Sequence, residues 1–380
     1  MIYAHLPIKP WPIKPWIIAL VCLALSLASL AFVNTTVSAQ GFAGLGTTAD
    51  GFEKPDPDKP LVFPRDHGAH PDYRIEWWYL TANLQGTDGK TYGVQWTLFR
   101  SAMRPPNKDA VQLTGWKDGQ TWMAHAGLTT PDTHFAAERF ARGGTGQAGV
   151  RNGAIEPFEA WIDDWSLTST AQPGKDAYSA MTVRATAPEF SYTLNLDAQG
   201  PLVFHGKEGF SVKSPEGQAS YYYSQPFYTV SGTLNLPSGP VTVTGTAWLD
   251  REWSSQPLSN NQQGWDWVSL HFADGAKMMG FRVRQTDGGD FTSATWIEPD
   301  GTTTPYGDGA VSFEPLGKTA VAGRTVPTHW RIKMPKRDLD ITIKAVNGKA
   351  WMPLSFPYWE GPVAIDGSHP GKGYLEMTGY

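Results

Sequence analysis

The chain has 380 residues, of which 41% are hydrophobic and 18% charged, with a formal net charge of −5 at pH 7. This mildly acidic balance argues against nucleic acid as a partner, and the length is enough for two domains. The single cysteine, Cys22, lies in an N-terminal apolar run. The rest of the chain therefore has neither a thiol nucleophile nor a cysteine-based zinc site.

Residues 1–39 have the pattern of a signal peptide. Two lysines precede an apolar run over 16–33, and the small-residue sequence "VSA" ends just before Gln40. An uncleaved membrane anchor is the alternative, because a run of this length can just span a bilayer. We expect cleavage after Ala39 and export to the periplasm or medium. The mature chain then carries a net charge of −7, since the leader holds two of the 31 basic residues and none of the 36 acidic ones.

The remaining sequence predicts an all-β protein behind a Pro-rich lead-in at 40–60. It is rich in aromatic residues, with 17 Trp, 14 Tyr and 17 Phe in the chain, and 40 Gly and 30 Pro supply turns. Only 134–142, "HFAAERFAR", is helix-like, over about two turns. We expect strands at 74–84, 91–101, 121–129, 158–168, 178–186, 190–197 and 219–233, then at 241–253, 265–272, 277–285, 292–298, 329–334, 338–346 and 374–379.

Two segments echo each other and indicate a duplicated fold. Residues 76–100 and 264–284 each contain a Trp-rich strand, an Asp-Gly turn and a returning strand that ends in Arg. We therefore expect two consecutive antiparallel β-barrels, at 61–225 and 226–380, with the boundary near Pro226. A barrel of about eight strands encloses a cavity for one small ligand.

Strand alternation places one carboxylate on an apolar face in each echo segment. Glu76 shares its face with Trp78 and Leu80, and Asp266 shares its face with Val268 and Leu270. A buried carboxylate is costly unless it is paired, hydrogen-bonded or protonated. Both acids are therefore expected to accept hydrogen bonds from a Trp or from the arginines that end the hairpins, Arg100 and Arg284. Binding of a ligand is the alternative role.

A third segment, 245–257, combines carboxylates and tryptophan on one strand face. Trp248, Asp250 and Glu252 alternate with Leu249, Arg251 and Trp253. Two acids beside a Trp form an acid–base constellation in an aromatic wall, and an exposed strand end is the alternative interpretation. Arg251 would tend to keep Asp250 ionised, but it points to the opposite face and need not pair with it.

Taken together, these segments resemble the AttH/carotenoid 1,2-hydratase group of lipocalin-like proteins. The resemblance covers about 61–380. It is carried by "HPDYRIEWWYLTANL", "MAHAGLT", "AERFARG", "YYYSQP", "TGTAWLDREWSS", "GWDWVSL" and "YWEGPVAIDGSHPGKGYLEMTGY". It implies two lipocalin-like barrels in an exported bacterial protein. The activity it implies is cofactor-free addition of water to the terminal double bond of an acyclic carotenoid, an isoprenoid.

The resemblance also implies roles for individual residues. Asp250 would be the protonated acid, Trp248 and Trp253 would stabilise a cation, and a second carboxylate such as Glu252 or a histidine would orient water. The stretch matching 250–253 bears a histidine in true hydratases, whereas this chain has Arg251 and Glu252. The candidates for binding a hydrophobic substrate are Glu76, Trp77, Trp78, Tyr79, His125, Trp265, Asp266, Trp267 and His271.

Other chemistry finds little support. "GTGQAG" at 144–149 does not follow a strand, no G-x-S-x-G elbow occurs, and His67 and His70 lie in a segment better explained as a polar loop than as a metal site. We expect no cofactor and no metal. A non-catalytic carrier that passes a lipid or other hydrophobic molecule to an ABC-transporter permease is the alternative function.

Overall fold

The computed structural model describes residues 49–106, 115–152, 157–256 and 261–380. The predicted signal peptide at 1–39 and the lead-in up to residue 48 lie outside these residues. Among the residues described, no helix is both long and apolar enough to cross a membrane.

The all-β prediction is confirmed, because nearly every described element is a strand of one of two large antiparallel sheets. The first sheet has thirteen strands, with the order β4-β3-β2-β1-β13-β12-β9-β8-β7-β6-β5 and two short strands paired to β12. Their bounds are β1 Ile75–Gly86, β2 Thr91–Ala102, β3 Gln120–Thr129, β4 His134–Arg142, β5 Ala148–Arg151, β6 Glu159–Ile162, β7 Trp165–Ser169, β8 Ala180–Thr186, β9 Ser191–Ala198, β10 Val203–Phe204, β11 Phe210–Val212, β12 Ala219–Leu236 and β13 Gly239–Ser254.

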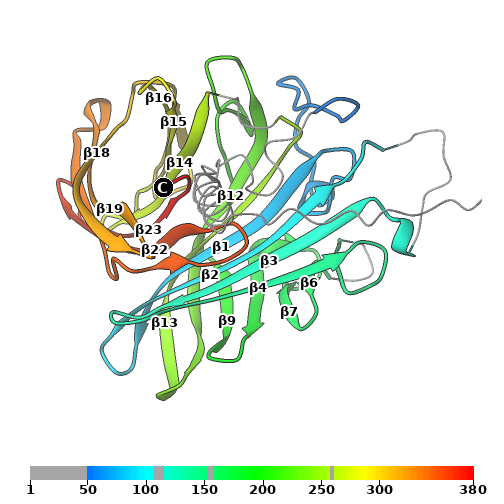
Figure 1. Ribbon diagram of the computed structural model, residues 1–380, viewed down its shortest axis with the longest axis horizontal. Helices are drawn as coiled ribbons and strands as arrows, with labels where there is room; N and C mark the ends of the chain where they lie inside the picture. The colour runs from blue at the N-terminus through cyan, green and yellow to red at the C-terminus, as the bar shows by residue number, and fades with distance from the viewer. Residues whose placement is uncertain (1–48, 107–114, 153–156, 257–260) are drawn as a thin grey trace, which may run out of the picture. The chain divides into compact units, whose positions relative to one another are not determined.

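The second sheet has ten strands in the order β17-β16-β15-β14-β23-β22-β20-β19-β18, with β21 paired to β22. Figure 1 shows these yellow-to-red strands curling round on themselves. Their bounds are β14 Gln262–Phe272, β15 Lys277–Gln285, β16 Asp290–Ile297, β17 Thr303–Tyr306, β18 Ser312–Val321, β19 Arg324–Met334, β20 Leu339–Ala345, β21 Trp351–Met352, β22 Tyr358–Gly367 and β23 Gly371–Met377. Single 3-10 turns occur at η2 Arg65–His67, η3 Gly115–Lys117, η4 Ala177–Ser179 and η5 Pro335–Arg337.

The chain changes sheet between β13 and β14, and not at Pro226 as the sequence suggested. Residues 226–254 were assigned to the second barrel, yet they pair within the first sheet, where β13 lies between β1 and β12. Pro226 lies where the register of β12 shifts between Gln225 and Tyr228. A bulge tolerates proline inside a strand because one residue there leaves the hydrogen-bond ladder.

The segment 134–142 is strand β4 and not a helix, so that prediction is wrong. It pairs with β3 along its whole length. Phe135, Ala137 and Ala141 pack on the first core, while Glu138 reaches His125 from the other face. This alternation has a period of two, and the pairing with β3 overrides the helical preference of "AAER".

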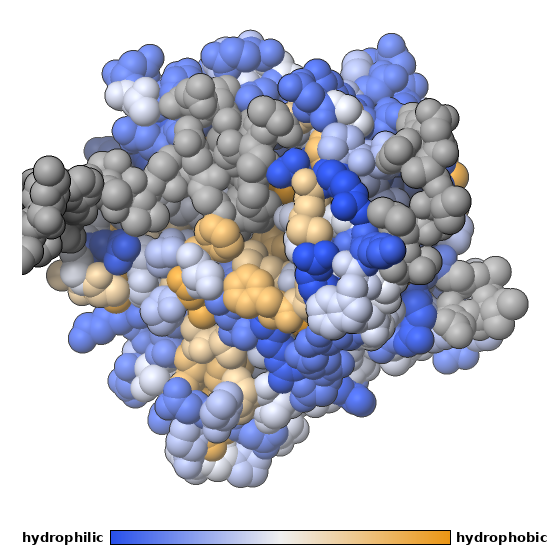
Figure 2. Space-filling view, turned by 45° about the vertical axis from the view of Figure 1, so that its right-hand side comes forward, coloured by the Kyte–Doolittle hydropathy of each residue, from blue (hydrophilic) through white to orange (hydrophobic). Residues whose placement is uncertain are grey.

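Both sheets fill their interiors with side chains. Asp250 lines a cavity, and this cavity therefore does not lie inside a barrel, contrary to the expectation from the sequence. Trp78, Trp96 and Trp165 are buried in the first core, and Trp330 and Trp359 in the second. A third cluster joins the sheets, with Tyr79, Tyr222 and Trp248 from the first and Trp267, Phe281 and Tyr374 from the second. The cavity borders this third cluster. Figure 2 shows a mostly hydrophilic surface with one hydrophobic band on the face in view.

Candidate functional site

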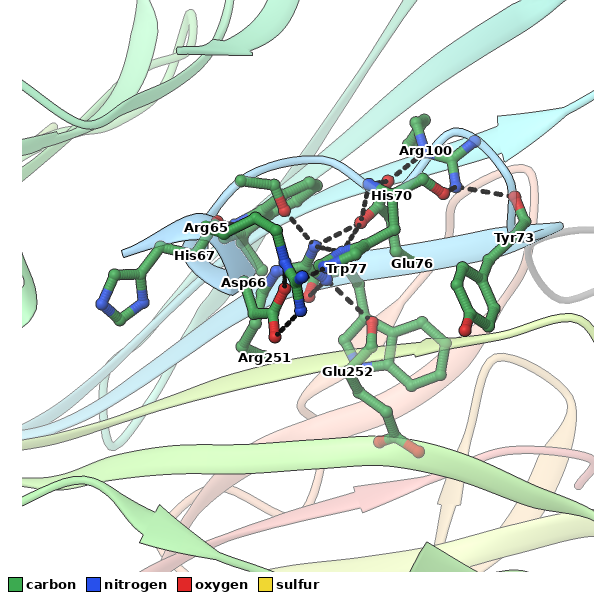
Figure 3. Close-up of polar contacts among 12 residues, drawn as sticks. Arg65, Asp66, His67, His70, Tyr73, Glu76, Trp77, Arg100, Arg251 and Glu252 are labelled. Carbon is green, nitrogen blue, oxygen red and sulfur yellow. Dashed lines mark hydrogen bonds and ion pairs between the residues drawn. The ribbon is translucent and has the colours of Figure 1, made fainter. Parts of the chain in front are cut away.

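Glu76 lies at the centre of a buried ion-pair network inside the first sheet. It forms ion pairs with Arg100 of β2 and Arg251 of β13, and the backbone N–H of His70 donates to its Oε1 at 2.9 Å. Figure 3 shows His70, Arg100 and Arg251 around this carboxylate. Burial alone would raise the pKa of Glu76, but the two guanidinium groups hold it well below its usual range. Glu76 is therefore a structural acceptor that lies outside the cavity.

Asp266 repeats this arrangement in the second sheet. Arg284 Nη1 lies 2.7 Å from Asp266 Oδ1, and the hydroxyl of Tyr380 donates to the same oxygen at 2.8 Å. Burial raises the pKa of Asp266, and the charge of Arg284 opposes that rise only in part. The two hairpins of the echo thus each end in a buried carboxylate–arginine pair, as the sequence suggested.

Asp250 and Arg251 lie on opposite faces of β13. The guanidinium of Arg251 lies 3.9 Å from the ring centre of Trp78 inside the first core, where it pairs with Glu76. Trp248, Asp250 and Glu252 face the second sheet, and Figure 3 shows Glu252 pointing away from the Glu76 network. Because Arg251 has its own carboxylate, it does not hold Asp250 in the ionised state.

Three donors fix the Asp250 carboxyl group. Trp248 Nε1 donates to Oδ1 at 2.6 Å, the hydroxyl of Ser224 donates to the same oxygen, and the hydroxyl of Tyr222 donates to Oδ2 at 2.7 Å. Each of these bonds favours the ionised form. Burial outweighs them, since Asp250 is only 2% exposed, and raises its pKa to about 7. A large share of molecules therefore carries a proton on Asp250 at neutral pH.

A hydrogen-bonded chain behind Asp250 links the two sheets. Ser224 lies 2.7 Å from His205 Nε2, and His205 Nδ1 lies 3.0 Å from the hydroxyl of Thr295 on β16. Burial lowers the pKa of His205 well below its usual value, so the ring is neutral. On the other side, Trp267 Nε1 donates to the Tyr222 hydroxyl at 3.1 Å. The orientation of Asp250 is thus fixed by groups from both sheets.

The cavity beside Asp250 has a smaller and a larger region, which adjoin and share part of their lining. Asp250 lines the smaller region. The larger region is mainly apolar and reaches Phe281 and Val283. The residues that line both are Trp77, Tyr222, Glu252, Trp265 and Trp267. The aromatic walls and the buried acid suit an apolar ligand.

Glu252, the second predicted carboxylate, is bound by a cation. Its Oε1 lies 2.9 Å from Lys213 Nζ and accepts a hydrogen bond from Ser220. The same ammonium group lies 4.5 Å from the ring centres of Tyr222 and Phe281. Glu252 and Lys213 thus form an ion pair on the wall of the larger region.

Two carboxylates that the sequence analysis did not select come from the second sheet. Glu376 lines the smaller region and accepts from Trp265 Nε1 at 2.6 Å. Burial raises its pKa to about 7, and repulsion from Asp250 adds to this rise. Glu360 is its direct neighbour on β22 and accepts from the hydroxyl of Tyr79. Both lie in "YWEGPVAIDGSHPGKGYLEM", a segment that the sequence analysis used only for the family resemblance.

The predicted site residues divide between the cavity and the protein core. Trp77, Tyr79, Trp265 and Trp267 line the cavity together with Asp250 and Glu252, and Trp248 holds Asp250. The predictions that lie elsewhere are Glu76, Trp78, His125, Trp253, Asp266 and His271. The assignment of Trp78 and Trp253 to the cavity is wrong. Trp78 directly follows Trp77 on β1, and Trp253 is separated from Asp250 by an odd number of positions on β13, so each points to the opposite face of its strand.

The predicted site residues that lie outside the cavity have structural roles, which their packing explains. Trp253 stacks on His70 at 4.0 Å inside the first sheet, and Trp78 donates to the carbonyl of His67. His125 is a satisfied core histidine, 3.0 Å from the hydroxyl of Tyr358 and 3.2 Å from Glu138. His271 packs edge-on against Trp248. Among the described residues, no group of three or more His, Cys, Asp or Glu could hold a metal ion.

The fold and cavity define an all-β protein with a buried carboxylic acid in an aromatic cavity between two antiparallel sheets. The AttH-like family model matches residues 54–380, so the chain belongs to this family. Its structure resembles that of an AttH protein from Nitrosomonas europaea, with a TM-score of 0.76 and 34% identity over 87% of this chain and 99% of the other.

One further solved structure and one protein matched by sequence have names that describe chemistry. Kievitone hydratase from Nectria haematococca shares the fold, with a TM-score of 0.61 and 14% identity over 86% of this chain and 98% of the other. The quinolone epoxide rearrangement protein asqO of Emericella nidulans is 25% identical over 264 residues, which is 68% of this chain. The match covers 66% of the asqO protein, just under two thirds of its length.

Proposed function

We propose that the protein is a cofactor-free acid catalyst that adds water across a carbon–carbon double bond of an isoprenoid or other long apolar substrate. The observation that carries this proposal is Asp250, a buried carboxyl group with its pKa raised to about 7, which borders an aromatic cavity. A general acid works best when its pKa lies near the working pH. Such an acid can protonate an alkene that has no other polar handle.

The remaining lining residues suit the cation that protonation would form. The rings of Trp77, Trp265 and Trp267 line the cavity, and an indole face attracts a cation. Trp248 and Tyr222 donate to Asp250, so they stabilise the carboxylate left after proton transfer. Water then adds to the cation and gives a tertiary alcohol.

The relatives support acid chemistry in this fold without fixing the substrate. One protein of the same fold is a hydratase that acts on kievitone, and one relative is a protein of quinolone epoxide rearrangement. Hydration and epoxide rearrangement can both begin with proton transfer to the substrate. Hydration of an acyclic carotenoid is the specific reaction we propose for this chain.

The carrier function is a second candidate, favoured by the larger, mainly apolar region of the cavity. A carrier would bind a lipid there and hand it to an ABC-transporter permease without chemistry. We also propose export, with Gln40 as the mature N-terminus. N-terminal sequencing of protein from the periplasm or medium tests this, and recovery of Met1 from membranes would favour an anchor.

The experiment that separates catalyst from carrier is incubation of the purified protein with lycopene, an acyclic carotenoid, in H₂¹⁸O. The catalyst yields a tertiary alcohol that contains the ¹⁸O label. The carrier quenches tryptophan fluorescence when lycopene binds but forms no alcohol.

A further inference from the structure

Addition of water to a cation needs a base as well as an acid, and the cavity offers two carboxylates besides Asp250. Glu252 is poorly suited, because Lys213 Nζ lies 2.9 Å away and Ser220 donates to the same oxygen. Both of these groups already occupy Oε1 of Glu252. The base must therefore be sought on the opposite wall.

Glu376 lies on that wall, on β23, in register with Trp267 of β14 and Glu360 of β22. Trp265 Nε1 donates to its Oε1 at 2.6 Å. No lysine, arginine or histidine among the described residues forms an ion pair with it, in contrast to Glu252. Glu376 thus faces the same small region as Asp250 and has a carboxylate without a compensating cation.

Glu360 explains how Glu376 can be the charged member of its pair. Like charges directly opposite on paired strands repel. Glu360 is 1% exposed, its Oε1 accepts from Tyr79, and its buried Oε2 has no hydrogen-bond partner in the described structure. Burial raises the pKa of Glu360 well above its usual range, so Glu360 stays protonated. The negative charge of the pair then belongs to Glu376.

We propose that Glu376 is the catalytic base that takes a proton from the attacking water, while Asp250 on the facing sheet is the acid. This inference rests on the proposed function. The π electrons of the alkene form a C–H bond with the Asp250 proton, which leaves a carbocation and a carboxylate. A lone pair of water forms the C–O bond, and the electrons of one O–H bond stay on oxygen as its proton passes to Glu376. Return of that proton from Glu376 to Asp250 resets the pair.

The surrounding groups favour Asp250 as the acid and Glu376 as the base near neutral pH. Asp250 and Glu376 both have a pKa raised to about 7, mainly by burial, and the charge of Asp250 adds to the rise at Glu376. Glu252 adds negative charge and is paired with Lys213, while the buried phenols Tyr79 and Tyr222 remain neutral. A coupled pair of this kind holds one proton over an intermediate pH range.

Deuterium labelling with lycopene in D₂O separates the acid step from the water step. Proton transfer from Asp250 places deuterium on the alkene carbon, and the cation then either captures water or loses a proton and returns labelled alkene. In Glu376→Gln we expect deuterium to enter recovered or isomerised lycopene, while alcohol formation falls at least ~10²-fold. A substitution of an exposed carboxylate outside the cavity should leave the ratio of alcohol to labelled alkene as in wild type. Glu314→Gln, on exposed β18, is the matched control.

Four results would overturn the inference. If Glu376→Gln forms alcohol at the wild-type rate, or loses deuterium uptake and alcohol together while folded, Glu376 is not the base. If Glu376→Gln does not fold, Glu376→Asp takes its place, and an unchanged ratio of alcohol to labelled alkene in that variant contradicts the assignment. If the wild type neither takes up deuterium into lycopene nor forms the alcohol, the proposed function is wrong, and the assignment of Glu376 as the base is then wrong as well.

Discussion

Asp250 and Arg251 are adjacent in sequence, but their side chains belong to different parts of the molecule. Arg251 lies over Trp78 and pairs with Glu76 in the first core, whereas Asp250 faces the cavity between the sheets. The same strand thus supplies a charged structural network on one face and an acid with a raised pKa on the other. In the sequence, Arg251 argued against a protonated acid at Asp250. In the structure, Arg251 instead stabilises the first sheet through its ion pair with Glu76.

The Glu76 network predicts a large loss of stability without a loss of chemistry. Glu76→Gln would leave the buried guanidinium groups of Arg100 and Arg251 without their counter-charge. Breaking such a buried pair costs about 3–5 kcal/mol in the free energy of unfolding. We expect this loss in urea unfolding, with activity per folded molecule retained. The control is Asp340→Asn, which removes an exposed partner of Arg331 and should change stability little. Equal stability of Glu76→Gln and wild type would contradict the network.

The hydrogen bond from Ser224 predicts the direction in which the pKa of Asp250 moves. Ser224→Ala removes a donor that favours the carboxylate, so the pKa of Asp250 should rise further above its present value of about 7. A bond to a charged group contributes about 1.5–3 kcal/mol, which corresponds to roughly one to two pH units. Carbon-13 NMR of the Asp250 carboxyl group measures the shift. A pKa that falls would show that Ser224 does not donate to Asp250.

The pH dependence of stability should have opposite signs for the two kinds of buried acid. Asp250 and Glu376 bind a proton more tightly in the folded state, so their contribution is complete below about pH 4 and is lost as the pH rises to about 7. Glu76 has a depressed pKa, so its contribution is present above the unfolded value and is lost in acid. The double variant Asp250→Asn, Glu376→Gln should flatten the decline between pH 4 and 7. Persistence of the full decline would contradict the raised pKa values.

Catalysis should show a bell-shaped dependence on pH. The reaction needs Asp250 protonated and Glu376 ionised, so the rate should peak near neutral pH and fall on both sides. Glu376→Gln should remove the acid limb of whatever activity remains, because no base has to be ionised. Steady-state rates of alcohol formation from lycopene measure this. A rate that keeps rising toward pH 4 would fit an acid without a titrating base.

Strand alternation made much of the site predictable from the sequence. It placed Glu76 in a core and separated Asp250 from Arg251, while the internal echo identified both arginine-ended hairpins. It could not show which face of a strand meets another sheet, because both faces of β1 and β13 carry aromatic residues. Trp78 and Trp253 were therefore assigned to the cavity although they fill the first core. Glu376 and Glu360 were missed because their proximity depends on the pairing of β22 with β23, and no spacing in the sequence specifies that pairing.

The most direct test of the central claim compares wild type and Asp250→Asn in two measurements with lycopene, alcohol formation in H₂¹⁸O and tryptophan quenching. A general acid contributes in the transition state, so Asp250→Asn should lower the rate at least ~10²-fold. Its affinity for lycopene should stay almost unchanged, because an apolar polyene gains little from the carboxyl group in the ground state. Binding by the wild type with no alcohol formed would contradict the account and identify the protein as a carrier.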